Sequence, residues 1–353
     1  VYTRQDIETG RQVWQSIGGQ QLGSIWGHGG YVAPDWGADW LHREAEAVLD
    51  IWARREAGAE SHKQLDEATQ AAYAKRVQAL LRPNTYDAVD GTIVVDNDRA
   101  EAIATVGAHY QSLFSADPAT ADLREAYAMR NDTVPDAEHR RELTAFYWWA
   151  AWASVTERPG SDITYTANWP ADNLVGNTAP PSAFIWTVFS VLFLIAGVAL
   201  LGWHYAVNHG DEMAPVLPKT DPLAAIKVTP SMRATAKYFW VVIALFLTQI
   251  LLGAITAHYQ VEGQQAYGFA ISEVLPYSLT RTWHTQLAVL WIATAWLGMG
   301  LYIAPAISGH EPKFQRLGVN FLWVCLIVIV VGAFAGQWFA VMQKLGLKHN
   351  FWF

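Results

Sequence analysis

Two ionisable side chains at the end of a long apolar run have a spacing that suits proton transfer. His258 and Glu262 stand four positions apart, so both lie on one face if a helix continues that far. Such a pair can accept the protons and hydrogen bonds of a quinol headgroup, with one group acting as base while the other supports it. A solvated pair at a membrane surface has the same spacing. Spacing alone favours the solvated pair.

His284 is a candidate metal ligand near the end of another apolar run. A neutral imidazole is an axial ligand for haem iron, and a haem in a helix bundle needs apolar walls and a histidine from each of two helices. Leu287, Ala288 and Trp291 follow closely and would supply part of a wall. A histidine held by structural hydrogen bonds is an equal alternative, because the sequence offers only half of an axial pair.

These residues belong to apolar runs that are long enough to cross a bilayer. About 20 residues at a rise of 1.5 Å each cover a hydrocarbon core of roughly 30 Å. The runs that qualify contain no Asp, Glu, Lys or Arg, and they are Ala183–Trp203, Tyr238–Ala257, Thr282–Ile303 and Leu317–Val341. Leu143–Val155 is too short to span, and we interpret it as a buried helix of a soluble domain, with an interfacial helix as the alternative. His204 borders the first run, where an interfacial role is favoured.

Residues 1–180 have the composition of a soluble domain, because they carry most of the charged side chains. Helical spacing of apolar residues predicts helices over 39–56, 65–82, 98–115 and 137–155, with Asp39 as the N-cap of the first. Thr92–Val95 is a strand candidate, and the Gly-rich, aromatic segment Ile17–Asp39 is predicted to be a loop. Residues 156–182 form a Pro-rich linker to the membrane.

The basic residues of the short loops predict the orientation in the membrane. The loops 204–237 and 304–316 are rich in Lys and Arg, whereas the loop 258–281 has one Arg against two Glu. The first two loops are therefore expected in the cytoplasm, and residues 1–180 in the periplasm. A domain exported ahead of its first span needs a signal or anchor, so we expect an anchor helix before Val1.

Cysteine usage and charge exclude several classes of protein. Cys325 is the single cysteine, so disulfides and cysteine-based metal sites are excluded, as is covalent haem attachment through C-x-x-C-H. The formal net charge of −8 comes without a clustered basic patch, which argues against nucleic acid as a partner.

Several stretches resemble the quinol-dependent nitric oxide reductases. They are Gly10–Ser16, Ser24–Trp36, Tyr147–Trp152 and Arg281–Trp291, and they follow one another in the family's order. The likeness covers nearly the whole chain, which makes it stronger than any one motif.

The resemblance implies a membrane all-α protein of the haem–copper oxidase superfamily. Residues 1–180 would be a mostly helical, cytochrome-c-like periplasmic domain without haem c. Residues 181–353 would be the first part of the transmembrane bundle, with four helices visible, in the bacterial inner membrane. The implied reaction is reduction of two nitric oxide molecules to nitrous oxide and water with electrons from membrane quinol, since the absent C-x-x-C-H argues against the cytochrome-c-fed relatives.

The resemblance also assigns roles to individual residues. His284 would be one axial ligand of the low-spin haem b, and His258 and Glu262 would form the quinol site. Gly29 and Tyr31 match a loop that helps to hold a calcium ion beside the haem propionates, a role that suits oxygen donors. The ligands of the high-spin haem b3 and of the non-haem iron, and the second ligand of haem b, are expected beyond Phe353.

A different class of function stays open at this point. A non-catalytic membrane scaffold or sensor with a partner-binding periplasmic domain would have the same hydropathy pattern, but it would bind no haem. A channel or transporter is disfavoured, because no span carries an Asp, Glu, Lys or Arg. The sequence does not decide between a monomer and a homodimer, nor the type of quinone.

Overall fold

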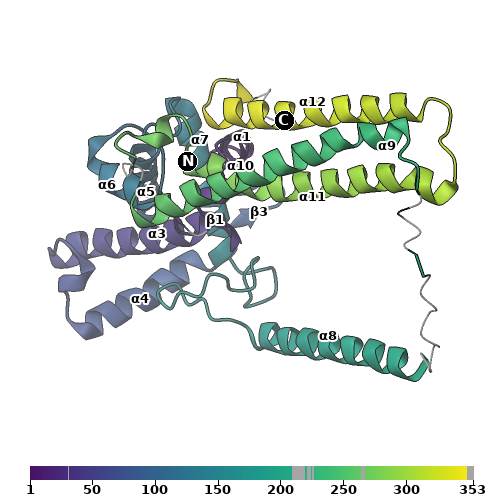
Figure 1. Ribbon diagram of the computed structural model, residues 1–353. Coiled ribbons are helices and arrows are strands. Elements are labelled where there is room, and N and C mark those ends of the chain that lie inside the picture. The colour runs from purple at the N-terminus through teal and green to yellow at the C-terminus, as the bar shows by residue number, and fades with distance from the viewer. Residues whose placement is uncertain (31, 209–218, 221–223, 225, 264–266, 348–353) are drawn as a thin grey trace.

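A computed structural model describes residues 1–353 except 31, 209–218, 221–223, 225, 264–266 and 348–353. The described residues are mostly helical, with strands only in two short hairpins. In Figure 1 a cluster of shorter helices packs against one end of three long helices, while α8 lies apart from them.

The N-terminal domain, which we name the outer domain after its expected location, is built from helices α1 to α7. Their bounds are α1 Arg4–Ser16, α2 Gly19–Leu22, α3 Trp36–Trp52, α4 Glu67–Leu81, α5 Asn97–Leu113, α6 Ala121–Ala126 and α7 Ala137–Val155. The helices predicted over 65–82, 98–115 and 137–155 are confirmed within two residues. α3 begins before the predicted residue 39, so the predicted N-cap was wrong: Asp35 is the cap, and its carboxylate accepts the backbone N–H of Ala38 at 2.9 Å.

Two hairpins interrupt these helices. β1 Ser24–Ile25 pairs antiparallel with β2 His28–Gly29 inside the segment expected to be a loop. β3 Tyr86–Asp87 pairs with β4 Thr92–Ile93, at the position of the strand candidate.

The core of the outer domain is filled by large aromatic side chains. Trp36 stacks on Tyr147 with ring centroids 5.5 Å apart, and Trp40 stacks on Tyr110 at 5.2 Å. All four are at most 1% exposed. Burial of such rings is the main stabilising contribution available to a domain of this size. The run Leu143–Val155 belongs to buried α7, as predicted, because it packs into this core.

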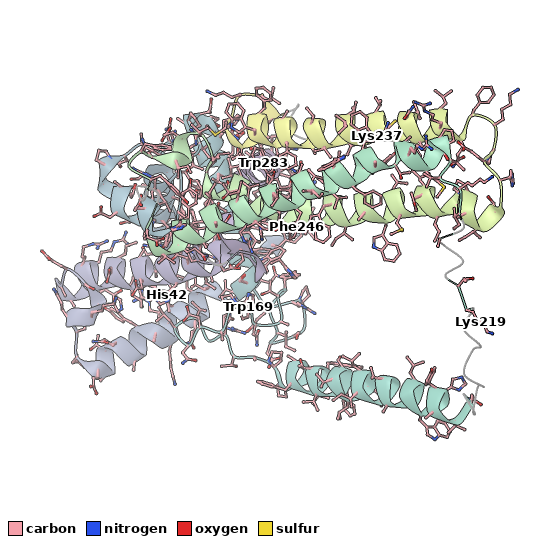
Figure 2. All side chains as sticks on the ribbon, viewed as in Figure 1. His42, Trp169, Lys219, Lys237, Phe246 and Trp283 are labelled. Atoms are coloured by element: carbon pink, nitrogen blue, oxygen red, sulfur yellow. The ribbon has the colours of Figure 1, made fainter. Side chains whose placement is uncertain are left out.

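Four helical segments are long and apolar enough to span a membrane, among the described residues. They are Pro181–Asn208 (α8), Pro230–Val261 (α9 Pro230–Ala234 with α10 Ala236–Val261), Tyr277–Ser308 (α11) and Gln315–Val341 (α12). Each contains one of the four predicted runs. Lys237 and Trp283, labelled in Figure 2, mark opposite ends of the bundle, and Trp283 is at the end nearer the outer domain.

Polar side chains tie the long helices together. Trp291 of α11 donates to Gln249 of α10 at 2.6 Å. Tyr238 of α10 donates to the carbonyl of Val319 in α12 at 2.7 Å. In a membrane the apolar faces alone give little preference for one packing, so these bonds fix the register of the bundle.

Candidate functional site

His284 lies on the face of α11 that packs against α10. Its Nδ1 is 2.9 Å from the backbone carbonyl oxygen of Gln249. Because a carbonyl can only accept, Nδ1 carries the hydrogen and Nε2 keeps its lone pair in the neutral ring. Histidines that bind metals are held in this way, by donation from the second ring nitrogen to a carbonyl or carboxylate. His284 therefore has the tautomer that an axial haem ligand requires.

Gly253 makes room for the imidazole. A Cβ at this position would lie 2.8 Å from Cε1 of His284 and 3.0 Å from Nδ1, closer than side chains approach one another. The ring can therefore lie against the backbone of α10 and reach the carbonyl of Gln249, one turn earlier. Sequence reasoning missed both Gly253 and Gln249. The available signal was a small residue and an amide in one apolar span.

His258 and Glu262 form a pair at the end of α10. Nδ1 of His258 and Oε2 of Glu262 are 2.7 Å apart, and the side chains are 48% and 47% exposed. The predicted juxtaposition is therefore present. The ring of Tyr267 stands edge-on to the imidazole at a centroid distance of 5.8 Å. The half-exposed pair is open to a molecule arriving from the surroundings.

The pair and His284 lie at the same end of the bundle. His258 stands five positions after Gly253, the contact of His284, which corresponds to about 7.5 Å along a helix axis. A molecule bound at the pair would therefore lie at nearly the same level of the bundle as a group bound at His284.

The Gly-rich segment of the outer domain covers this end of α11. Arg281, one turn before His284, donates to the side chain of Gln21 at 2.6 Å. Gly30 packs against the same guanidinium, since a Cβ there would lie 3.0 Å from Nη1 of Arg281. The segment thus lies within one helical turn of the candidate ligand.

Gly29 and Tyr31 are the two residues that the resemblance assigns to a calcium site. Gly29 ends the hairpin β1–β2 with φ +144°, and a Cβ there would be 2.6 Å from the carbonyl oxygen of Gly23. Only glycine fits this position. Tyr31 lies outside the described residues.

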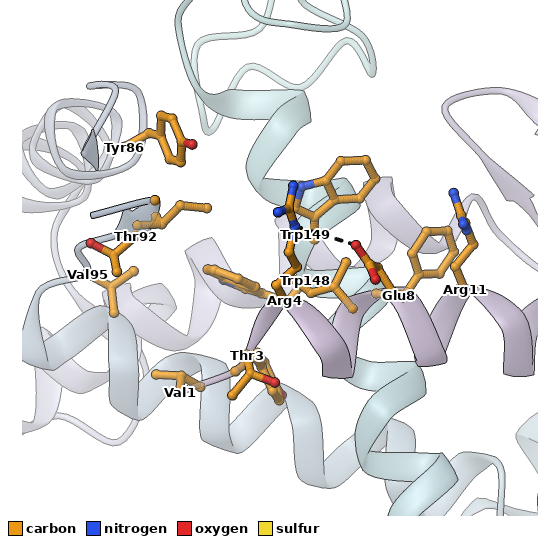
Figure 3. A pocket seen from close by; sticks show the side chains of 15 residues that line it. Val1, Thr3, Arg4, Glu8, Arg11, Tyr86, Thr92, Val95, Trp148 and Trp149 are labelled. Carbon is orange, nitrogen blue, oxygen red and sulfur yellow. Dashed lines mark ion pairs between the residues drawn. The ribbon is translucent and has the colours of Figure 1, made fainter. Parts of the chain in front are cut away.

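A cavity of about 790 Å³ lies elsewhere, between α1, the hairpin β3–β4 and α7 (Figure 3). Trp148 and Trp149 form part of its wall, and the ion pair between Arg4 and Glu8, at 3.5 Å, stands beside it. Neither His258 nor His284 lines it. The cavity is therefore separate from the candidate site.

Comparison with known proteins gives two consecutive family matches. Residues 1–171 match the NorB cytochrome c-like domain family of the nitric oxide reductases, and residues 233–353 match the family of cytochrome c and quinol oxidase polypeptide I. The chain belongs to the haem–copper oxidase family, in its NorB-like branch. The NorB polypeptide of nitric oxide reductase from Stutzerimonas stutzeri is 30% identical over 93 residues, which are 26% of this chain and 19% of that relative.

The two family matches have consequences for the cofactors and for the location of the protein. Haem cofactors are implied by the two matched domains, and a multi-pass membrane protein fits the four apolar helices. The outer domain matches a cytochrome c-like family although the chain lacks C-x-x-C-H, so it has no residues for covalent haem attachment. The aligned stretch spans about a fifth of the length of the curated relative.

Proposed function

We propose that this chain is the quinol-oxidising part of a quinol-dependent nitric oxide reductase. The observation that carries the proposal is the hydrogen-bonded pair His258–Glu262, which lies at the same end of the bundle as His284. The absence of C-x-x-C-H supports quinol over cytochrome c as the donor. In the complete enzyme, nitric oxide would be reduced at a high-spin haem b3 and a non-haem iron.

Each residue of the proposed site has a separate role. Nε2 of His284 would hold the iron of a low-spin haem b, which when bound accepts electrons singly from the donor. The carbonyl of Gln249 keeps the proton on Nδ1 and so keeps Nε2 available. His258 accepts a proton from the quinol hydroxyl, and Glu262 orients the imidazole and stabilises the positive charge that results.

Location and partners follow from the same proposal. The protein would lie in the bacterial inner membrane with residues 1–180 in the periplasm, because basic residues concentrate in the loops 204–237 and 304–316. Calcium, held in part by Gly29 and Tyr31, would neutralise the haem propionates. A visible spectrum of the purified full-length protein separates this proposal from the scaffold or sensor, which would show no haem bands.

The decisive experiment compares two electron donors in the full-length enzyme. His258→Ala and Glu262→Ala should lower quinol-driven nitric oxide reduction about a hundredfold, the scale of a lost general base. Haem content and turnover with an artificial donor that bypasses the quinol should be unchanged. His310→Ala, an exposed histidine on the loop after α11, is the matched control. If activity with both donors falls by one common factor, the pair supports the fold instead. If quinol-driven activity is unchanged, His258 and Glu262 are a solvated surface pair without a role in quinol oxidation.

A further inference from the structure

The short helix α6 of the outer domain is anchored firmly. Arg124 is 4% exposed, and its guanidinium donates to Oγ1 of Thr120 at 2.6 Å and to the carbonyl of Asp117 at 2.7 Å. A helix of six residues has little stability of its own, so these bonds determine where the next residue points. That residue is Glu125, which is half-buried.

Glu125 reaches the turn that ends α10. A Cβ on Gly263 would lie 2.5 Å from Oε1 of Glu125, so the carboxylate rests against the glycine backbone. Gly263 has φ +82°, and its N–H donates to the carbonyl of His258 at 3.2 Å. A carboxylate of the outer domain is therefore in contact with the residue that follows Glu262, on the turn bonded to His258. Figure 1 places α6 at this end of the bundle.

Other ionisable groups surround this contact. Tyr259 of α10 lies within electrostatic range of Glu125, Tyr267 and Glu273. Arg130, on the segment after α6, faces Glu273 and Asp132, and burial lowers the pKa of this guanidinium. Apart from Arg130, these groups are acidic or phenolic, so the local charge favours binding of a proton over binding of an anion.

We propose that Glu125 relays protons from the His258–Glu262 pair to the outer aqueous phase, an inference that rests on the proposed quinol site. Oxidation of one quinol breaks two O–H bonds and yields a quinone, two electrons and two protons. A haem held by His284 would accept the two electrons singly. His258 takes each proton in turn, Glu125 accepts it from the pair, and water outside removes it before the next transfer. Glu125 contacts neither quinol nor iron in this scheme, so it is a relay and not a catalytic residue.

The relay has a consequence for pH dependence. With a carboxylate acceptor beside the pair, protons leave the site without waiting for hydroxide, so the quinol-driven rate should depend weakly on pH near neutrality. Without it, protons must pass directly to solvent, and the rate should rise steeply with pH. A residue that merely packed α6 against α10 would not change this profile.

The test uses the full-length enzyme with a short-chain ubiquinol as donor. Glu125→Gln should lower quinol-driven turnover about tenfold at pH 7, with partial recovery toward alkaline pH and in Glu125→Asp. The haem spectrum and turnover with the bypassing donor should stay as in the wild type. Asp122→Asn, an exposed position on the same helix, is the matched control and should change nothing.

The outcomes separate the relay from the quinol site on which it rests. If His258→Ala and Glu262→Ala abolish quinol activity while Glu125→Gln keeps the wild-type rate and pH profile, the relay is wrong and the quinol site stands. If His258→Ala and Glu262→Ala both leave quinol activity unchanged, the quinol site is wrong. An equal loss with both donors in Glu125→Gln overturns the relay and makes Glu125 structural.

Discussion

Gly253→Ala tests the geometry that makes His284 a ligand. The added Cβ would meet Cε1 of His284 at 2.8 Å and Nδ1 at 3.0 Å, whereas ordinary contact begins at 3.4 Å. The ring must therefore move by at least several tenths of an ångström. The 2.9 Å bond from Nδ1 to the carbonyl of Gln249 then stretches out of the hydrogen-bonding range.

The cost can be worked from these contacts. Overpacking by one methyl group costs about 1–3 kcal/mol, and the lost hydrogen bond adds about 1 kcal/mol. Loss of a partner that orients a metal ligand lowers metal affinity or activity about 10–100-fold. We therefore expect haem b to be lost in part, and the remainder to show a weakened low-spin signal.

The assay is the optical and electron paramagnetic resonance spectrum of the full-length enzyme, normalised to protein. Gly300→Ala is the matched control, because this glycine of α11 has open space where its Cβ would lie. The control should keep the wild-type spectrum. If Gly253→Ala also keeps full haem content and an unshifted low-spin signal, His284 does not hold the haem in this geometry.

Two further predictions concern the chain outside the site. Cysteine introduced at Lys219 should react only with a membrane-permeant reagent in intact cells, and cysteine at Ser161 should also react with an impermeant one; the opposite pattern would refute the assigned orientation. Asp6→Asn should destabilise the outer domain by about 2 kcal/mol near neutral pH, because Arg141 lowers the pKa of Asp6 from 3.8 to about 2 and so stabilises the folded carboxylate. This contribution to stability is present above pH 3.8 and is lost as the pH falls through about 2. The thermal unfolding midpoints of the variant and the wild type should therefore converge in acid. Asp122→Asn, at an exposed position, is the control and should not change the midpoint.

The sequence by itself determined the four apolar spans, the helices α3, α4, α5 and α7, and the division into two kinds of surroundings, but it did not predict α1, α2 or α6. Apolar runs without charge predict membrane spans whatever their neighbours, because the cost of a charge in hydrocarbon is a local property. The spacing of His258 and Glu262 was sufficient to predict their contact, because residues four apart on one helix meet without help from another element. The N-cap was misplaced from Asp35 to Asp39 because both residues cap well and only the backbone path selects between them.

Only the tertiary structure decided which residues from different helices meet. The hydrogen bond between His284 and the carbonyl of Gln249 joins residues 35 positions apart, so no sequence pattern predicted the tautomer of the imidazole. No sequence pattern marks Gly253 or Glu125. Gly253 matters because it has no Cβ beside the ring of His284, and Glu125 because it contacts Gly263. Such contacts depend on the rotation and register of packed helices, which in an apolar span are set by a few polar bonds and small residues that hydropathy cannot distinguish.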